Sequence, residues 1–203
     1  MVKKISARIT NAMNGFSKRW GPSKLKQRLW DEEYSQGEWA RIEQTENDIV
    51  YEFLEKYCAG GSILDLACGS GNTGTELNYG SYRDYTGIDI SEVAIQKAMR
   101  RSQAAGRDGK NRYFQSDMLS YSPNRAYDII LVRESIQYIP EKRMKSTVDR
   151  FVASLSPQGV FVVRVGRGSV LELESVVFWF ENNYRLVEKY TSADGNTCVL
   201  VLR

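Results

Sequence analysis

Two glycines after a short apolar run are the first residues of the chain whose spacing suggests chemistry. Residues 63–67 read as a buried strand, Gly69 and Gly71 as a tight turn, and residues 72–77 as the first turns of a helix. Glycine accepts a positive φ and leaves no Cβ between the backbone and a bound molecule. The free N–H groups at the start of the helix favour a polar or anionic group. The segment therefore predicts a ligand-binding site at the end of the first strand.

Charged side chains follow three later apolar runs at equivalent positions. Asp89, Asp117 and the pair Arg133 and Glu134 each come at the end of an expected strand. A carboxylate about 20 residues after the glycines is suited to accept hydrogen bonds from both hydroxyls of a ribose. In a doubly wound sheet, ligands bind outside the carboxyl ends of the strands, so we expect these residues in one crevice.

Strand and helix patterns alternate along residues 62–202, and this alternation requires a parallel sheet with helices on both faces. Strands are expected at residues 63–67, 82–90, 111–116, 127–132, 160–165, 184–191 and 197–202, and helices at residues 72–77, 91–105, 141–155 and 170–182. The last two strands flank the turn at residues 193–196 and form a hairpin. In the helix at residues 91–105 the expected N-cap is Ser91, and the residues available to pack inward are Val93, Ala94, Ala98 and Met99.

The composition excludes several kinds of chemistry. The 203 residues, 42% hydrophobic and 26% charged, fit one globular domain and contain no histidine. This absence removes the commonest general base, the commonest zinc ligand and every Ser-His or Cys-His nucleophile. The three cysteines lack metal-ligand spacing, so no metal is expected, and they fit reduced thiols. No apolar run approaches the roughly 20 residues that span a bilayer, and no secretory signal is evident, so a cytoplasmic location is expected.

The charge of the chain is concentrated near its N-terminus. Eight Lys and Arg residues precede Asp31, the first acidic residue. We interpret residues 1–28 as a basic leader. It is either a solvated, flexible segment or an arm that binds nucleic acid, anionic lipid or an acidic partner. Residues 29–58 are expected to form a helical cap.

An aromatic cluster beside Gly37 is the most distinctive feature of this cap. Trp30, Tyr34 and Trp39 would either pack against the body or cover a substrate, with Arg41 pairing with a carboxylate of that substrate.

Residues 62–202 resemble the class I S-adenosylmethionine-dependent methyltransferase family. The segments DLACGSG at residues 65–71, GIDIS at 87–91 and SDM at 116–118 are similar to the first three motifs of that family, and the closing hairpin is similar to its reversed seventh strand. A nicotinamide dinucleotide fold would also place an acid at Asp89, and the glycines at 69, 71 and 74 have its spacing. The strand, however, enters the turn through Ala67 and Cys68 with Asp65 just before, and a dinucleotide fold has no reason to end in a hairpin.

The resemblance implies the fold class and the cofactor. The fold class is α/β, a Rossmann-like doubly wound sheet of seven strands, mostly parallel with an antiparallel C-terminal strand, preceded by N-terminal helices. Residues 29–203 form the methyltransferase domain, with the core at 62–202, and the cofactor is S-adenosyl-L-methionine. Backbone near Ala67 would hold its methionine part, Asp89 its ribose and Asp117 the region of the adenine. The residues expected to bind the cofactor are Asp65, Ala67, Gly69, Gly71, Asp89, Ile90, Asp117, Met118 and Arg133.

The end of the fourth strand is where members of the family place substrate chemistry. Residues 134–139 resemble the Glu-x-x-Glu-His stretch of small-molecule methyltransferases, with Gln137 and Tyr138 in place of the second acid and the histidine. Glu134 and Tyr138 are the expected catalytic residues, although Glu134 could instead cap the next helix. The residues expected to bind the substrate are Tyr34, Trp39, Arg41 and Arg164.

The expected reaction is methyl transfer to oxygen or nitrogen of a small acceptor, such as a sugar or a natural-product intermediate. The acceptor would be anionic if Arg133, Arg164 and Arg167 face the crevice rather than solvent. Two alternatives stay open: an RNA or protein methyltransferase that uses the basic arm, and a non-catalytic cofactor-binding protein.

Overall fold

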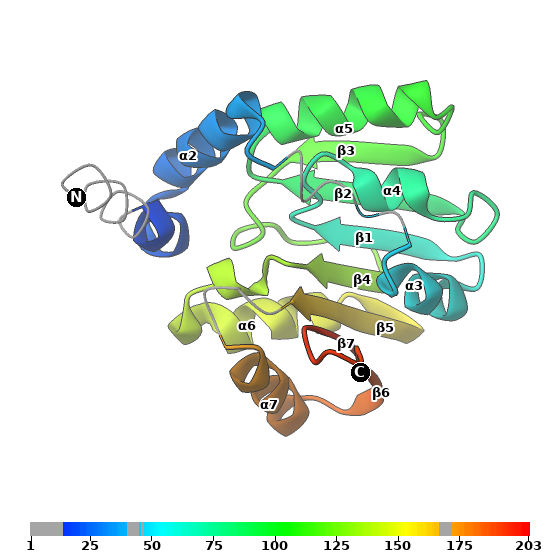
Figure 1. The fold of residues 1–203 in the computed structure, drawn as a ribbon. Helices are drawn as coiled ribbons and strands as arrows, with labels where there is room; N and C mark the ends of the chain where they lie inside the picture. Colours follow the sequence, from blue (N-terminus) through cyan, green and yellow to red (C-terminus); the bar gives the residue numbers. More distant parts are fainter. Residues whose placement is uncertain (1–13, 40–44, 46, 167–171) are drawn as a thin grey trace.

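A single sheet of seven strands organises the part of the chain that the computed structural model describes, namely residues 14–39, 45, 47–166 and 172–203. The strands are β1 (Ser62–Leu66), β2 (Asp84–Asp89), β3 (Asn111–Gln115), β4 (Tyr127–Arg133), β5 (Leu155–Gly166), β6 (Leu186–Thr191) and β7 (Thr197–Leu202). Their order is β3-β2-β1-β4-β5-β7-β6 (Figure 1). Neighbours from β3 to β5 pair in parallel, whereas β7 runs antiparallel to β5 and β6. The predicted α/β fold with a reversed last strand is confirmed.

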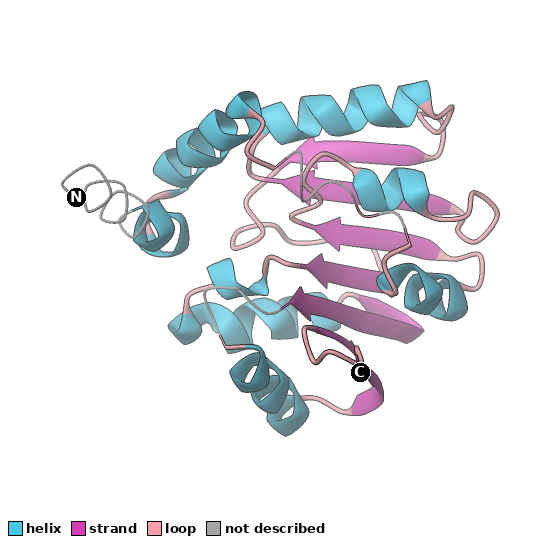
Figure 2. Ribbon diagram, in the orientation of Figure 1, coloured by secondary structure: helices cyan, strands magenta, loops and turns pink. Residues whose placement is uncertain are grey.

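Helices cover both faces of this sheet (Figure 2). They are α2 (Ser23–Gln36), α3 (Val50–Cys58), α4 (Asn72–Glu76), α5 (Glu92–Ala104), α6 (Glu141–Val152) and α7 (Leu173–Asn183), with a 3-10 turn η1 at Ile136–Tyr138. In β4, Ile129 and Leu131 belong to the hydrophobic cluster that contains α3 and α5, whereas Ile130 and Val132 belong to the cluster that contains α6 and α7. Successive side chains of a strand point to opposite faces, so an apolar run buries both faces.

The N-terminal part includes helical residues 14–20 and α2, which follows the predicted break at Gly21 and Pro22. Because α2 extends from residue 23 to residue 36, the helix crosses residue 28, where the sequence placed the end of the leader. That division stays a prediction. Two basic residues of this part, Lys18 and Lys26, are buried.

Two local expectations were wrong. Met99 is 54% exposed, because the face of α5 that packs inward carries Ala94, Ile95 and Ala98 instead. The fifth strand begins at Leu155 rather than at residue 160. Tyr127 of β4 pairs with Leu155, and Ile129 pairs with Val160, so the register between the two strands shifts at a β-bulge. The bulge lets residues 156–159, which include a proline and a glycine, form part of the strand.

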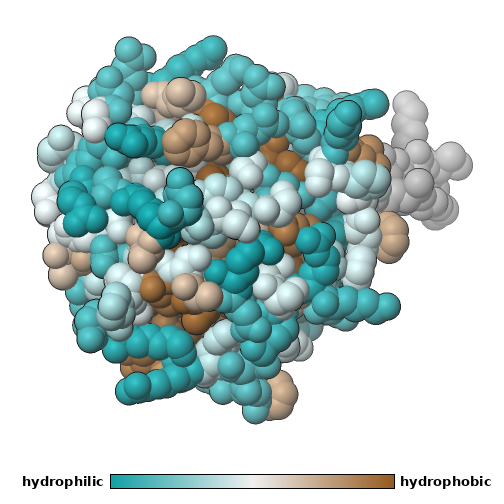
Figure 3. All heavy atoms as spheres, turned by 180° about the vertical axis from the view of Figure 1, so that it is seen from behind, coloured by the Kyte–Doolittle hydropathy of each residue, from teal (hydrophilic) through white to brown (hydrophobic). Residues whose placement is uncertain are grey.

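The surface opposite to the view of Figure 1 is mostly hydrophilic, with hydrophobic side chains in small separate patches (Figure 3). Among the described helices, none combines the length and the apolar character needed to cross a membrane.

The turn after β1 yields a test of the packing. Gly71 has φ +79°, and a Cβ there would lie 2.7 Å from the Ala98 Cβ of α5. We expect Gly71→Ala to lower the free energy of unfolding by about 2–4 kcal/mol, because backbone strain adds to a clash with a helix. Gly106 also has a positive φ, +64°, but has open space around it. Gly106→Ala should therefore cost only about 1–2 kcal/mol. Urea unfolding measures both, and equal losses would show that the contact with α5 is not tight.

Candidate active site

A cavity of about 860 Å³ lies where β1, β2, β4 and β5 end, and α2 and the loop between β6 and β7 contribute to its wall. Most of the residues predicted from the sequence line it: Tyr34, Trp39, Asp65, Ala67, Gly69, Asp89, Ile90, Asp117, Met118, Arg133, Glu134, Tyr138 and Arg164. Gly71 is not in the lining, since it packs under the turn against α5. Arg41 and Arg167 lie outside the described residues. The cavity therefore brings together the predicted cofactor and acceptor residues, whose roles stay predictions.

Backbone strain is concentrated at two strand ends of this cavity. Ala67 follows β1 with φ +59°, and Glu134 follows β4 with φ +51°. Such values cost a residue with a Cβ on the order of 1–3 kcal/mol and persist only where the surrounding structure fixes them. The turn that begins at Ala67 brings backbone into the cavity, and Gly69 is so close to α2 that a Cβ there would lie 2.8 Å from the Tyr34 hydroxyl.

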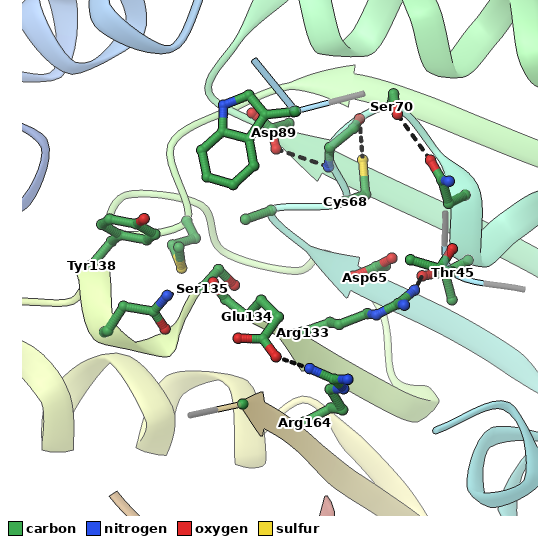
Figure 4. Close-up of a pocket in the computed structure, with 18 of the residues that line it drawn as sticks. Thr45, Asp65, Cys68, Ser70, Asp89, Arg133, Glu134, Ser135, Tyr138 and Arg164 are labelled. Atoms are coloured by element: carbon green, nitrogen blue, oxygen red, sulfur yellow. Dashed lines mark hydrogen bonds and ion pairs between the residues drawn. The ribbon is translucent and has the colours of Figure 1, made fainter. Parts of the chain in front are cut away.

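Asp89 joins the ends of β1 and β2 to the start of α5. Its carboxylate accepts a hydrogen bond from the N–H group of Gly69 at 2.9 Å (Figure 4). It also accepts one from the N–H group of Ser91 at 2.8 Å. Burial raises the pKa of Asp89 to about 6, although these backbone donors oppose the rise. The Ser91 hydroxyl in turn donates to Asp31 of α2 at 2.6 Å, so the helix is tied to the same corner.

Asp65 is a buried carboxylate with spare hydrogen-bonding capacity. The Tyr85 hydroxyl donates to its Oδ2 atom, while Oδ1 has no hydrogen-bond partner in the described part of the chain. Burial raises the pKa of Asp65 to about 7. Because a buried polar atom without a partner is costly, this oxygen in the cavity wall suits a ligand that donates a hydrogen bond or carries a positive charge.

Four charged groups form a connected chain on the acceptor side of the cavity. Arg133 donates to Asp48 at 2.9 Å, and Arg164 contacts the same Asp48 oxygen at 3.1 Å. Arg164 also pairs with the Glu134 carboxylate (Figure 4). These contacts neutralise both guanidinium groups and fix the Glu134 side chain at the cavity. Sequence reasoning missed Asp48, whose only local signal is its position before the apolar face of α3.

Asp117 is held by α2 at the opposite end of the site. It accepts hydrogen bonds from the Ser23 hydroxyl at 2.7 Å and from Lys26 at 3.4 Å, and its other oxygen accepts the Leu119 N–H at 2.9 Å. Burial acts to raise the pKa of Asp117, but these donors outweigh it and lower the pKa below the ordinary value. The carboxylate is therefore a fixed anion that anchors the helix over the cavity.

An aromatic wall separates α2 from the end of β4. The Trp30 ring packs edge-on against Tyr138 with centroids 4.9 Å apart, and Trp39 lies 5.4 Å from Trp30 and 6.2 Å from Tyr34. Burial raises the pKa of Tyr138, so the phenol is protonated near neutral pH and suits a hydrogen-bond donor better than a base. In the described ranges, no group of three or more His, Cys, Asp or Glu side chains could hold a metal ion.

Comparison with known proteins agrees with this geometry. Residues 63–159, just under half of the chain, match a family model described as a methyltransferase domain. The N-methyltransferase NodS from Bradyrhizobium japonicum WM9, solved in complex with S-adenosyl-L-homocysteine, superposes with a TM-score of 0.69 at 22% identity, over 87% of this chain and 97% of that chain.

Two sequence relatives point to the same family. The 27-O-demethylrifamycin SV methyltransferase of Amycolatopsis mediterranei is 24% identical over 58% of this chain and 46% of its own length. The trans-aconitate 2-methyltransferase of Escherichia fergusonii is 31% identical over 51% of this chain and 38% of its own length. The chain thus spans less than half the length of these relatives.

The sheet with one reversed strand and a cavity at its carboxyl edge defines the class I S-adenosylmethionine-dependent methyltransferase fold. The three motifs predict this fold, and the structure and the match of residues 63–159 to a methyltransferase domain agree with that prediction.

The raised pKa of Asp65 predicts a particular dependence of stability on pH. The folded protein holds this proton up to about pH 7, whereas the unfolded chain releases it near pH 4. The contribution of Asp65 to stability is therefore complete below pH 4 and is lost as the pH rises to about 7. We expect the free energy of unfolding of Asp65→Asn, relative to the original chain, to increase from pH 4 to pH 8 in urea titrations. The exposed substitution Asp108→Asn should show no such trend, and a flat difference for Asp65→Asn would contradict the burial argument.

Proposed function

We propose that the protein transfers a methyl group from S-adenosylmethionine to oxygen or nitrogen of a small-molecule acceptor. The observation that carries this proposal is the convergence in one cavity of Asp89, the strained turn after β1 and the unpaired Asp65 oxygen. Two relatives are named for small acceptors, 27-O-demethylrifamycin SV and trans-aconitate, which supports the same class of substrate.

The cofactor half of the cavity would be formed by the ends of β1, β2 and β3. Asp65 Oδ1 suits the ammonium group of the methionine part, and Asp89 suits the ribose hydroxyls. Met118 and Asp117 line the region expected to hold the adenine. When bound, S-adenosylmethionine supplies an electrophilic methyl group, so alignment of the acceptor contributes much of the rate.

The acceptor half would be formed by Glu134, Tyr138 and the aromatic wall. Glu134 has a positive φ that directs its carboxylate into the cavity, and the ion pair with Arg164 holds this carboxylate in place. We assign to Glu134 the acceptance of the proton that an acceptor hydroxyl or amine loses. Tyr138 would donate a hydrogen bond that orients the acceptor.

A small acceptor fits the way in which the cavity is covered. Helix α2 is fixed over the cavity edge through contacts to Asp117 and Ser91, which leaves little room for a macromolecule. Lys18 and Lys26 are paired with Glu33 and Asp117, so their charges are not free for nucleic acid. The expectation of an anionic acceptor receives no support from Arg164, because its charge is shared between two carboxylates.

Loss of the Asp89 carboxylate tests the cofactor site. We expect Asp89→Ala to weaken binding of S-adenosylhomocysteine by at least tenfold in calorimetric titrations, because two charge-assisted hydrogen bonds are worth roughly 1.5–3 kcal/mol each. The matched control is Asp84→Ala at the opposite end of β2, where the carboxylate contacts Arg83 and Arg125 instead. Equal affinities for both variants and the original chain would place the ligand elsewhere.

Label transfer tests both the reaction and the class of acceptor. The protein would be incubated with methyl-tritiated S-adenosylmethionine and a bacterial extract separated into small molecules and macromolecules. We expect label in the small-molecule fraction, at an initial rate that Glu134→Gln reduces by about 100-fold or more, since a general base contributes about 10²–10⁴-fold. The exposed Glu52→Gln on α3 is the control and should retain the rate.

Three other outcomes would each overturn part of this proposal. Label in a macromolecular fraction that ribonuclease or protease releases would favour the alternative acceptors. Binding of S-adenosylhomocysteine without label in any fraction would favour a non-catalytic protein. An unchanged rate for Glu134→Gln would remove Glu134 from catalysis.

A further inference from the structure

Lys18, from the helical residues 14–20, lies against two aromatic rings at the wall of the cavity. The Lys18 ammonium lies 4.0 Å from the centroid of the Trp30 ring and 5.9 Å from that of Trp39. The same ammonium pairs with the Glu33 carboxylate, and Lys18 as a whole is only 7% exposed. We call Trp30, Trp39 and Glu33 the ammonium cage.

The cage combines the two features that bind organic cations. Ring faces within about 6 Å attract an ammonium group through their quadrupole, and a carboxylate supplies the opposite charge. The Trp39 indole N–H donates to Glu33 at 3.1 Å, and Tyr138 packs edge-on against Trp30. These contacts do not involve Lys18, so they hold the two indole rings in place without the lysine.

The segment that carries Lys18 leaves its largest apolar side chains in solvent. Helical residues 14–20 expose their two largest apolar side chains, Phe16 at 68% and Trp20 at 44%. Among the described residues, the second ion pair of this segment to the body joins Arg19, whose side chain is 11% exposed, to Glu141 at 3.2 Å, where the carboxylate is 74% exposed. Because Phe16 and Trp20 do not anchor the segment, departure of Lys18 from the cage breaks ion pairs rather than packing of the segment's largest apolar side chains.

The charges around the cage favour a cationic occupant. Lys18, Trp30, Trp39 and Tyr138 line the same cavity as Glu134. On the acceptor side, the positive charges of Arg133 and Arg164 are balanced by Asp48 and Glu134. Once Lys18 leaves, Glu33 is a carboxylate without its partner beside two indole rings, and a second ammonium group would restore the balance.

We propose that the ammonium cage binds the cationic group of an amine-bearing acceptor, and that Lys18 fills the cage until this acceptor replaces it. The identity of the occupant as a methyl acceptor rests on the proposed methyltransferase function. The affinity of the cage for an ammonium group does not.

The test is calorimetric titration of the full chain and of Lys18→Ala with choline at constant ionic strength, and with 3,3-dimethylbutan-1-ol, the neutral carbon analogue of choline. Alanine removes both the charge and the stem of Lys18 and thereby empties the cage. We expect the variant to bind choline at least tenfold more tightly than the original chain does, and at least tenfold more tightly than it binds the analogue. The further substitution Glu33→Gln should abolish this preference.

Matched controls separate the cage from general effects of charge and folding. The exposed Lys24→Ala on α2 should bind choline as the original chain does. If Lys18→Ala does not melt cooperatively, Lys18→Gln, which keeps a stem, takes its place. Choline binding that is no tighter in the variant, or equal binding of choline and its analogue, would overturn the proposal. S-adenosylhomocysteine is titrated into the same samples. Its failure to bind while the choline preference persists would contradict the methyltransferase function and leave the cage intact.

Discussion

The parallel pairing of β1 with β2 on one side and with β4 on the other is the constraint on which the site depends. It brings the carboxyl ends of these strands to one edge, and the residues that follow them line one cavity. Ala67 and Glu134 turn the chain at two of these ends with positive φ, and the buried strands on either side hold them there. Packing energy in the sheet thus maintains the backbone geometry of the site.

Carboxylates removed from water give the site its chemical character. Asp89 is satisfied by backbone N–H groups, Asp117 by α2, and Asp48 by two arginines, so each is already compensated. Asp65 differs, because one of its oxygen atoms has no partner among the described residues. Burial raises the pKa of both Asp89 and Asp65, to about 6 and about 7. An uncompensated buried oxygen is what a preformed site offers to a cationic or hydrogen-bond-donating ligand. Glu134 is more exposed and lies where an acceptor would enter.

The sequence predicts the strand ends well because each is marked locally, by an apolar run that stops at a glycine or a charged residue. The ion pairs were not predictable in this way. Asp48 and Arg133 are 85 positions apart, and nothing in either neighbourhood indicates the other. Lys18 reads as a solvated residue of a basic leader, yet α2 and the turn after it supply Glu33 and two indole rings to bury it. The inward face of α5 was misjudged at Met99. Ile95 and Met99 are four positions apart on the same side of the helix, so the sequence does not tell which of them the body covers.

A crystal structure of the protein with S-adenosylhomocysteine tests the central claim most directly. The account predicts the ligand in the cavity at the ends of β1 and β2, with its ribose hydroxyls within hydrogen-bond distance of Asp89 and its amino group near Asp65 Oδ1. Ligand density away from these two carboxylates, or an empty cavity at saturating ligand, would contradict the assignment of this edge of the sheet as the cofactor site.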